Sequence, residues 1–376
     1  MISAIFKNFL KSEKTGGFIL IFCTVCSLIL ANSSWGNLYI HFWNLSFQQH
    51  TITLWINDGL MAIFFLLIGL ELKRELFVGE LSNIKSALFP IVSAIGGVAI
   101  PALIFISFNY QTTFQRGAGI PMATDIAFAI GILSLLGKSV PTSLKIYLTA
   151  LAVIDDLCAI LVIAFFYSNN ISTFYLLCSL VLFTGLFILN RLKVNKLTPY
   201  LIGGIALWYC MLHSGVHATI SGILLAFVIP LGEKTDISIS YKLQHALHYP
   251  VAIIIIPLFA LANTCITINS NWKSDLTSML SIGIITGLVI GKPLGILLFS
   301  RLSCILGLCK LPNGLTWKQI GAVSILAGIG FTMSIFITIL AFDTNEIIEQ
   351  CKIAIIVASA IASIIGLLAL KIQLNK

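Results

Sequence analysis

The stretch "LAVIDDLCAI" (residues 151–160) places two adjacent carboxylates, Asp155 and Asp156, in an otherwise apolar segment. No other charged residue occurs between Lys145 and Arg191. A charged side chain at the centre of a bilayer costs roughly 2.5–3.5 kcal/mol on insertion scales, so such residues usually face a cavity or a partner and mark an ion or substrate path. The two aspartates are therefore candidate cation-binding residues.

Three further ionisable groups fall inside apolar runs: Asp125, Lys292 and, near the outer end of its run, Asp58. At a rise of about 1.5 Å per residue, Asp125, Asp155 and Lys292 all lie near the middle of a bilayer. We therefore expect these three residues to meet at one depth and to mark an ion path. The alternative is a structural ion pair that ties helices together.

Adjacent residues of a helix point about 100° apart, so we expect Asp155 and Asp156 to have different partners. Two carboxylates this close in a poorly solvated site do not ionise independently, and they titrate as a pair. Lys292 acts in the opposite sense, because a nearby cation stabilises an ionised partner. The arrangement predicts a site that binds and releases a cation.

The composition is that of a membrane protein with many spans. The chain has 376 residues, of which 58% are hydrophobic and 10% charged, and its mean hydropathy is +1.03. A helix needs roughly 20 apolar residues to cross a bilayer core. The apolar runs predict twelve spans, at residues 17–33, 52–72, 87–108, 117–136, 143–167, 173–189, 200–213, 215–231, 246–265, 279–300, 320–342 and 353–370. We expect one all-α domain, residues 1–376.

The basic residues favour twelve spans with both termini in the cytoplasm. In that topology eighteen Lys and Arg residues lie on the cytoplasmic side and three on the outer side, and Lys292 lies within a span. Basic residues accumulate in cytoplasmic loops, so the net charge of +8 requires no nucleic-acid partner. The N-terminus resembles a signal peptide, but we expect a retained first span, because its apolar run is long and no convincing cleavage site ends it.

The nine cysteines lie mostly in apolar runs, and we expect them to be small buried hydrophobes. The "CTVC" of Cys23 and Cys26 has redox spacing, but it lies in a predicted membrane helix without a βαβ context. Cysteine chemistry therefore plays no part in the predicted function.

The longest outer connection, residues 35–51, alternates aromatic or aliphatic with polar residues. This pattern predicts a small outer β-hairpin between spans 1 and 2. Trp35, Tyr39 and Trp43 are its expected anchors at the level of the lipid headgroups.

Two spans carry helix-breaking residues beside polar ones. In "GAGIPMATDIAFAIGIL" a proline and Thr124 precede Asp125, and "ILAGIGFTMS" contains Gly328 and Gly330. These residues predict interrupted helices in spans 4 and 11, crossing near the bilayer middle, with free carbonyls and helix ends available to a ligand. Close helix packing is the alternative explanation of the glycines.

Spans 3–5 and 10–12 lie seven positions apart, and this odd offset gives the second trio the opposite orientation. Both trios begin with a helix that carries glycine and proline, "GGVAIPALI" from Gly96 and "GKPLGILLF" from Gly291, and both place the interrupted span second. The pattern predicts inverted-topology repeats, as in many secondary transporters.

Seven motifs resemble the bacterial Na+/H+ antiporter family NhaA across essentially the whole chain: "WINDGLMAIFFLLIGLELKREL", "PMATDIAFAIGIL", "LAVIDDLCAI", "SGVHATISG", "PLFALAN", "GKPLGI" and "GIGFTMSIFI". Inverted repeats are a known feature of this family. The resemblance implies a secondary, electrogenic, pH-regulated antiporter of the bacterial inner membrane that serves Na+ and pH homeostasis. It would export Na+ or Li+ and import a larger number of protons by alternating access. It implies no enzyme activity and no cofactor; its partners would be Na+, Li+, H+ and membrane lipid.

Carried over by motif, the resemblance implies that Asp155 and Asp156 hold the Na+. It implies that Asp125 and Thr124 are supporting groups at the first interrupted helix. Lys292 would be the lysine that pairs with Asp155.

The resemblance also implies charged groups at the two ends of span 2. Asp58 matches the acidic residue at its outer end. Glu71, Arg74 and Glu75 match the cytoplasmic entrance, which takes part in pH sensing.

A second pH-sensing region is implied by "LQHALH", with Gln244, His245 and His248, and by His217. Two residues depart from the family pattern, and we expect them to affect the activating pH. Gln244 stands where an acidic residue commonly precedes the first histidine, and His213 stands where a lysine can occur. The alternative for His217 is a satisfied structural residue.

Other classes use similar residues. An intramembrane aspartyl protease needs two buried aspartates on different helices, but its Tyr-Asp and Gly-x-Gly-Asp signatures are absent. A retinal-binding protein would use Lys292, but twelve spans are too many, and the absence of a G-x-x-x-x-G-K-[ST] loop disfavours an ATP-driven pump. The composition alone does not exclude a passive Na+ channel. The sequence also leaves open the oligomeric state (a homodimer included), the stoichiometry, the preference for Na+ or Li+, the activating pH and the resting conformation.

Overall fold

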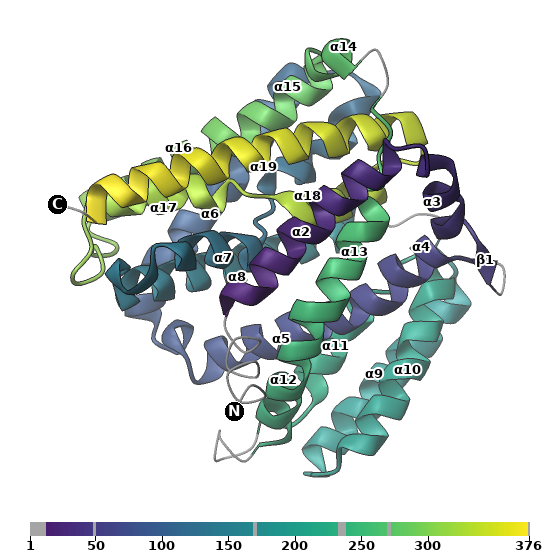
Figure 1. The fold of residues 1–376 in the computed structure, drawn as a ribbon. Helices are drawn as coiled ribbons and strands as arrows, with labels where there is room; N and C mark the ends of the chain where they lie inside the picture. The colour runs from purple at the N-terminus through teal and green to yellow at the C-terminus, as the bar shows by residue number, and fades with distance from the viewer. Residues whose placement is uncertain (1–12, 48–49, 168–170, 232–237, 269–271, 375–376) are drawn as a thin grey trace, which may run out of the picture.

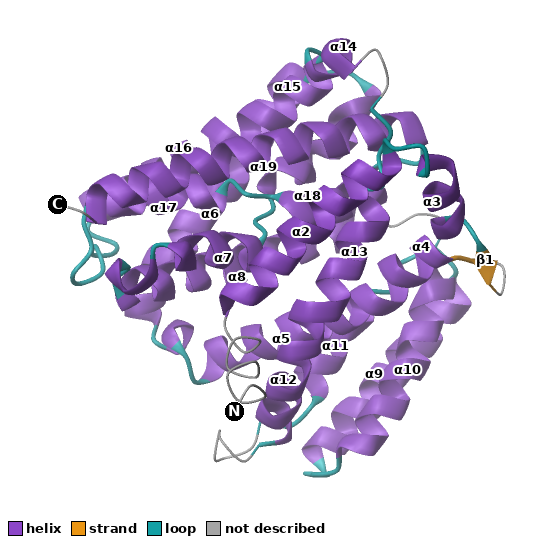
Figure 2. Ribbon diagram, viewed as in Figure 1, coloured by secondary structure: helices purple, strands orange, loops and turns teal. Residues whose placement is uncertain are grey.

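The computed structural model describes residues 13–47, 50–167, 171–231, 238–268 and 272–374, and these are almost entirely helical (Figure 1, Figure 2). The α-helices are α2 (Glu13–Ala31), α3 (Gly36–Trp43), α4 (Ile52–Leu54), α5 (Met61–Phe77), α6 (Ile84–Phe108), α7 (Ile126–Leu135), α8 (Thr142–Phe166), α9 (Thr173–Arg191), α10 (Leu197–Ser214), α11 (Ile220–Val228), α12 (Ile239–Pro250), α13 (Ile256–Asn263), α14 (Trp272–Leu276), α15 (Met279–Thr286), α16 (Lys292–Ile305), α17 (Trp317–Ala327), α18 (Phe331–Ala341) and α19 (Asn345–Leu374). The 3-10 segments are η2 (Glu80–Ser82), η3 (Thr113–Met122) and η4 (Gly137–Ser139), and the π-helical segments are η1 (Trp55–Leu60), η6 (Val251–Ile255) and η7 (Gly287–Gly291). The described residues also form two strands, β1 (Ser46–Phe47) and β2 (His50–Thr51).

Several helices are long and apolar enough to cross a membrane. By length and composition the described residues contain seven such stretches: Ile52–Phe77, Ala87–Phe108, Thr142–Ala164, Thr173–Arg191, Ile239–Asn263, Met279–Ile305 and Asn345–Leu374. The number rises to ten if three bent pairs each count as one span, namely α2 with α3, η3 with α7, and α17 with α18. The chain is therefore a multi-pass membrane protein.

Two of the twelve predicted spans are not among these ten. They contain α10 and α11, and α11 has only nine residues. Nine residues of helix rise about 14 Å, which is less than half of a hydrocarbon core about 30 Å thick. Hydropathy along the sequence does not reveal this, because the flanking residues are also apolar.

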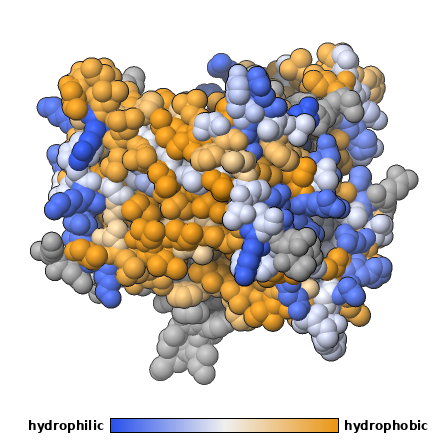
Figure 3. Space-filling model, turned by 90° about the horizontal axis from the view of Figure 1, so that it is seen from above, coloured by the Kyte–Doolittle hydropathy of each residue, from blue (hydrophilic) through white to orange (hydrophobic). Residues whose placement is uncertain are grey.

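The surface has the pattern expected of a protein that faces lipid. One face carries a broad field of hydrophobic residues across its middle, with hydrophilic residues along its two sides (Figure 3). Large apolar side chains are exposed on several helices, for example Phe22 of α2, Val181 of α9 and Leu298 of α16. A soluble monomer rarely exposes apolar patches of this extent.

The connection between α2 and α5 differs in part from its prediction. The predicted antiparallel sheet is present, with Ser46 opposite Thr51, but it is confined to the end of the connection. The preceding residues form α3, in which the rings of Tyr39 and Trp43 pack edge to face with centroids 5.9 Å apart. Trp35, Tyr39 and Trp43 recur every four residues, which is the spacing of one helix face rather than of a strand.

A very close helix crossing joins α6 and α16, which begin the two predicted repeats. A Cβ atom on Gly96 would lie 2.3 Å from the carbonyl oxygen of Gly295, and one on Gly295 would lie 2.1 Å from that of Gly96. Only residues without a side chain allow two helix backbones to approach this closely. The crossing brings Lys292, one turn before Gly295, against the interior of the fold.

Lys73 near the end of α5 fastens the short helix α11. Its side chain is buried, and its Nζ donates to the carbonyls of Ala226, Phe227 and Ile229 at 3.3, 2.8 and 2.5 Å. The last carbonyls of a helix have no partner within the helix, and the helix dipole there favours a cation. In the predicted topology Lys73 is one of the basic residues on the cytoplasmic side. In the structure it is a buried cap at the C-terminal end of α11.

We expect Gly295→Ala to lower the stability of the protein by about 1–3 kcal/mol, because the added methyl would meet the Gly96 carbonyl in a filled interior. Thermal unfolding of the purified protein in detergent measures this change. Gly185→Ala in α9 is the matched control, since a Cβ there has no heavy atom within 4 Å. Equal melting temperatures for the two variants would contradict the close crossing.

Candidate functional site

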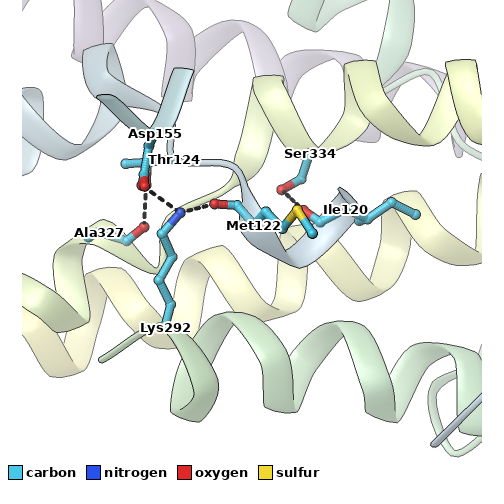
Figure 4. Close-up of polar contacts among 7 residues, drawn as sticks. All are labelled: Ile120, Met122, Thr124, Asp155, Lys292, Ala327 and Ser334. Atoms are coloured by element: carbon cyan, nitrogen blue, oxygen red, sulfur yellow. Dashed lines mark hydrogen bonds and ion pairs between the residues drawn. The ribbon is translucent and has the colours of Figure 1, made fainter. Parts of the chain in front are cut away.

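Two buried breaks between helices lie against each other deep in the fold. Residues 123–125 separate η3 from α7, which are bent by 40°, and residues 328–330 separate α17 from α18, which are bent by 46°. The backbone N–H of Asp125 donates to the carbonyl of Ile329 at 2.7 Å, so the first break is bonded directly to the second. Ser334 of α18 adds a link to the carbonyl of Ile120 at 2.7 Å (Figure 4).

The glycines of the second break are required by close packing. A Cβ on Gly328 would lie 2.4 Å from the carbonyl oxygen of Leu288, and one on Gly330 would lie 2.1 Å from Oγ of Ser334. The first break instead follows Pro121, which has no backbone N–H to donate. The packing explanation therefore applies to Gly328 and Gly330 even though both also stand at the break.

Lys292 and Asp155 form a buried ion pair beside the two breaks (Figure 4). Nζ of Lys292, at the start of α16, lies 2.8 Å from Oδ2 of Asp155 on α8, and neither side chain is exposed. Nζ also donates to the carbonyl of Met122. Thr124 places its Oγ1 2.7 Å from the same Oδ2 and 2.9 Å from the carbonyl oxygen of Ala327. Two helices and both breaks thus converge on one carboxyl group.

The hydroxyl of Thr124 has one proton for two acceptors. When Asp155 is ionised, this proton is donated either to Asp155 or to Ala327, and the other contact is not a hydrogen bond. When Oδ2 of Asp155 carries a proton, it donates to Thr124, whose own proton is then donated to Ala327. The surroundings of Asp155 therefore accommodate both the charged and the protonated form.

Asp156 lacks the partners that Asp155 has. Both side chains are 1% exposed, and the Oδ1 atoms of both are buried without a hydrogen-bond partner. Among the described residues no ion pair reaches Asp156, although Asp125 and Glu71 are among the charged groups that act on it. Native proteins keep few buried polar atoms unsatisfied, because each costs about 1–3 kcal/mol. The two Oδ1 atoms are therefore the best candidates for ligands of a bound cation.

Asp125 is bonded to two helix ends rather than to the ion pair. Its Oδ1 accepts the N–H of Phe128 in the first turn of α7 at 2.9 Å. Its Oδ2 accepts the N–H and the hydroxyl of Thr332 in the first turn of α18, at 3.1 and 2.5 Å. One carboxylate thus caps two helix N-termini, where free N–H groups and the helix dipoles favour a negative charge. Its neighbour Thr124 connects it to Asp155.

Asp58 lies apart from this cluster. It is half-buried in η1, and its carbonyl accepts the indole N–H of Trp208 at 3.0 Å. His50 of the small sheet and Trp55 line a cavity of about 10 Å³ next to it. The structure therefore places Asp58 near the outer connection, as its position in the predicted span requires.

The predicted entrance residues of α5 are adjacent to α12. Arg74 pairs with the neighbouring Glu75, with Nη2 3.0 Å from Oε1. Glu71 contacts the side chain of Gln244, which is buried. The glutamine that departs from the family pattern is thus the α12 residue that faces the charged end of α5.

The predicted pH-sensing histidines lie in two places, and His213, a departure from the family pattern, lies in a third. His245 and His248 lie on the exposed side of α12. His217 is half-buried, with Nε2 2.9 Å from the carbonyl oxygen of Tyr167, so it has a structural partner. His213 is exposed at the end of α10.

Sequence reasoning expected free carbonyls at the two breaks, but it did not identify the residues that supply them, and it missed the role of one hydroxyl. The carbonyl of Met122 contacts Lys292, and that of Ala327 contacts Thr124. The type of a residue does not show whether its carbonyl is free. Thr332 is the second residue of α18 after the second break, and a hydroxyl within one turn of a broken helix was the available signal for its role.

Comparisons with known proteins give full-length matches. The Na+/H+ antiporter 1 family matches residues 7–370. A relative from Flavobacterium johnsoniae named Na(+)/H(+) antiporter NhaA 1 is 61% identical over 366 residues, which are 97% of this chain and 96% of the relative. Relatives named Na(+)/H(+) antiporter NhaA from Cytophaga hutchinsonii and Vibrio cholerae are 60% and 46% identical, with 100% of this chain covered and 97% and 100% of the relatives.

We expect Asp125→Asn to lower stability by about 1.5–3 kcal/mol, the usual contribution of hydrogen bonds to a charged group, because two helix ends lose their anion. Thr332→Val should have a smaller effect of the same sign, and thermal unfolding in detergent measures both. Thr184→Val removes an exposed hydroxyl of α9 that donates to a carbonyl of its own helix, and serves as the control. If Asp125→Asn melts like this control, the capping role is wrong.

Proposed function

The chain belongs to the Na+/H+ antiporter 1 family, and it therefore exchanges Na+ for protons; we propose that Asp155 and Asp156 carry the exchanged ions. It is a transporter and not an enzyme. The observation that carries this assignment is the pair of buried, unpartnered Oδ1 atoms beside a single compensating cation, Lys292, in the described chain.

Na+ is a hard cation, and it prefers oxygen ligands. The unpartnered oxygens of Asp155 and Asp156, the hydroxyl of Thr124 and the carbonyls of the two breaks are the proposed ligands, with water completing the shell. The described residues contain no group of three or more His, Cys, Asp and Glu side chains that could hold a metal ion. Hydroxyl and carbonyl oxygens are therefore needed beside the carboxylates. The Na+ is cargo here, and no cofactor is proposed.

Competition for the same oxygens couples the two fluxes. Na+ binds when the carboxylates are ionised, and protons displace it by occupying them. An empty site with two negative charges and one lysine is too costly to carry through a closed, dry intermediate, so the carrier moves only when loaded. Two carboxylates can carry more protons than Na+ ions per cycle, which supports electrogenic exchange by alternating access.

We propose twelve spans in the bacterial inner membrane, with both termini cytoplasmic and one transport domain. Helices lie in all twelve predicted ranges, which supports this count; α10 is the proposed span 7, and α11 with the residues on either side of it, 215–231, is the proposed span 8. The bends at residues 123–125 and 328–330 support interrupted spans 4 and 11. The crossing of α6 and α16 supports two inverted repeats that meet at the site.

Regulation by pH is proposed for the cytoplasmic end of α5 and for α12. The contact between Glu71 and Gln244 supports this location, because it joins the two regions that the family resemblance implies. A glutamine does not change charge with pH. The proposed pH-sensing residues here are therefore Glu71, Glu75 and the exposed His245 and His248. Li+ is a proposed second substrate, and a homodimer in lipid is the proposed assembly.

We expect Asp156→Asn to abolish exchange in everted membrane vesicles, because the substituted amide can neither bind a proton nor neutralise Na+. The measurement is the dissipation of a pH gradient on addition of NaCl. Asp343→Asn makes the same chemical change at an exposed site outside the helices, and it should transport normally. Undiminished Na+-dependent dissipation by Asp156→Asn would rule out the proposed role, and saturable, proton-coupled flux in the wild type would exclude a channel.

We expect Lys292→Ala to lower stability by about 3–5 kcal/mol, the usual cost of leaving one member of a buried ion pair alone. It should also move the pH profile of exchange to more alkaline pH, since a carboxyl group without a nearby cation holds its proton more strongly. Thermal unfolding and exchange over a pH series measure the two effects. Lys318→Ala at the start of α17 is the control lysine variant. An unshifted profile together with unchanged stability would argue against the pair.

A further inference from the structure

The last turn of α16 and the residues after it bring two thiols together. Sγ of Cys304 lies 3.9 Å from Sγ of Cys309, and Oγ of Ser303 lies 2.9 Å from Sγ of Cys309. Cys309 is buried and Cys304 is half-buried, while residues 305–308 between them are exposed. Cys304 is therefore the thiol of the pair that a small reagent reaches first. The expectation that the cysteines are merely small apolar residues does not describe it.

The backbone fixes this arrangement. Gly307 has a φ of +72°, and its left-handed conformation ends α16. The N–H of Leu308 donates to the carbonyl of Ser303 at 3.0 Å, and the N–H of Gly307 donates to that of Cys304 at 3.1 Å. This is a glycine-terminated helix cap, in which the chain reverses over the last turn. The reversal returns Cys309 to the side chains of residues 303 and 304, so the two sulfurs are held together before any ligand arrives.

We propose that Cys304 and Cys309 form a dithiol site for one thiophilic ligand that bridges both sulfurs, a trivalent arsenical or a soft d10 cation. Two thiolates bonded to one central atom at about 2.3 Å lie at most about 4.6 Å apart, so a single atom can bridge sulfurs that are 3.9 Å apart. Thiolates select soft ions. The described residues offer no third His, Cys, Asp or Glu for this pair. A ligand that needs only two protein thiolates is therefore favoured over a closed four-ligand zinc site.

The probe is phenylarsine oxide. Two S–H bonds break and two As–S bonds form, the arsenoxide oxygen leaves as water with both thiol protons, and arsenic stays trivalent, so no oxidant is required. We expect the purified, folded protein in detergent to gain one phenylarsenic group per chain. Intact-protein mass spectrometry measures this gain, which should survive excess monothiol and be reversed by a dithiol. The readout does not involve transport, so it is independent of the proposed function.

The pair is tested against another pair of the same chain. Cys304→Ser and Cys309→Ser should each abolish the monothiol-resistant adduct, whereas Cys23→Ser with Cys26→Ser on α2 should leave it unchanged. Each variant is first shown to be monodisperse by size-exclusion chromatography. Absence of the adduct in the wild type, or its persistence in Cys309→Ser, would overturn the proposal.

The turn is tested with two glycines. Gly307→Ala should weaken arsenical binding about 5- to 30-fold, because a left-handed residue with a Cβ depopulates the turn that joins the sulfurs. Gly314→Ala changes another glycine with positive φ (+79°) in the same connection, and it should bind like the wild type. Equal binding by the two variants would show that the cap does not preorganise the site.

Discussion

A carboxylate buried in a medium of low dielectric constant needs compensation, and two of the three aspartates of the site obtain it from the protein. Asp155 has the ammonium group of Lys292 at 2.8 Å. Asp125 has the N-termini of α7 and α18. Asp156 has neither among the described residues, which leaves one negative charge uncompensated when all three are ionised. An exchanger needs such a charge, because cargo binds where the protein itself does not provide neutrality.

The close packing of α6 against α16 brings Lys292 within reach of Asp155. Gly96 and Gly295 let α6 and α16 touch, and Lys292 lies one turn before that contact. A Cβ on the adjacent Gly97 would lie 3.9 Å from Oδ1 of Asp155, so α6 also limits the space around the unpartnered oxygen. Side chains at these glycines would separate the helices and lengthen the ion pair. The ion pair between Lys292 and Asp155 therefore depends on the close packing of α6 and α16.

The sequence predicted the ionisable members of the site because their cost in lipid makes each one conspicuous. Asp125, Asp155 and Lys292 were expected to meet; Lys292 pairs with Asp155, whereas Asp125 is bonded to two helix ends. The carbonyls of Met122 and Ala327 could not be predicted, since every residue has a carbonyl and only the fold decides which are free. The prediction of strands was wrong for the residues of α3, because aromatic residues spaced four apart were taken as the alternation of a strand. The length of α11 was misjudged because hydropathy does not distinguish an apolar helix from an apolar loop packed inside the protein.

Lys73 shows that an excess of basic residues on one side of a membrane protein is not the same as a positively charged surface. Its ammonium group is enclosed by three carbonyls at the end of α11 and holds that helix to α5. An amine-reactive, membrane-impermeant label applied to the cytoplasmic face would pass it over. A topology map built from lysine modification would therefore detect no reaction at this end of α5 and would assign it to the interior of the membrane or to the opposite side.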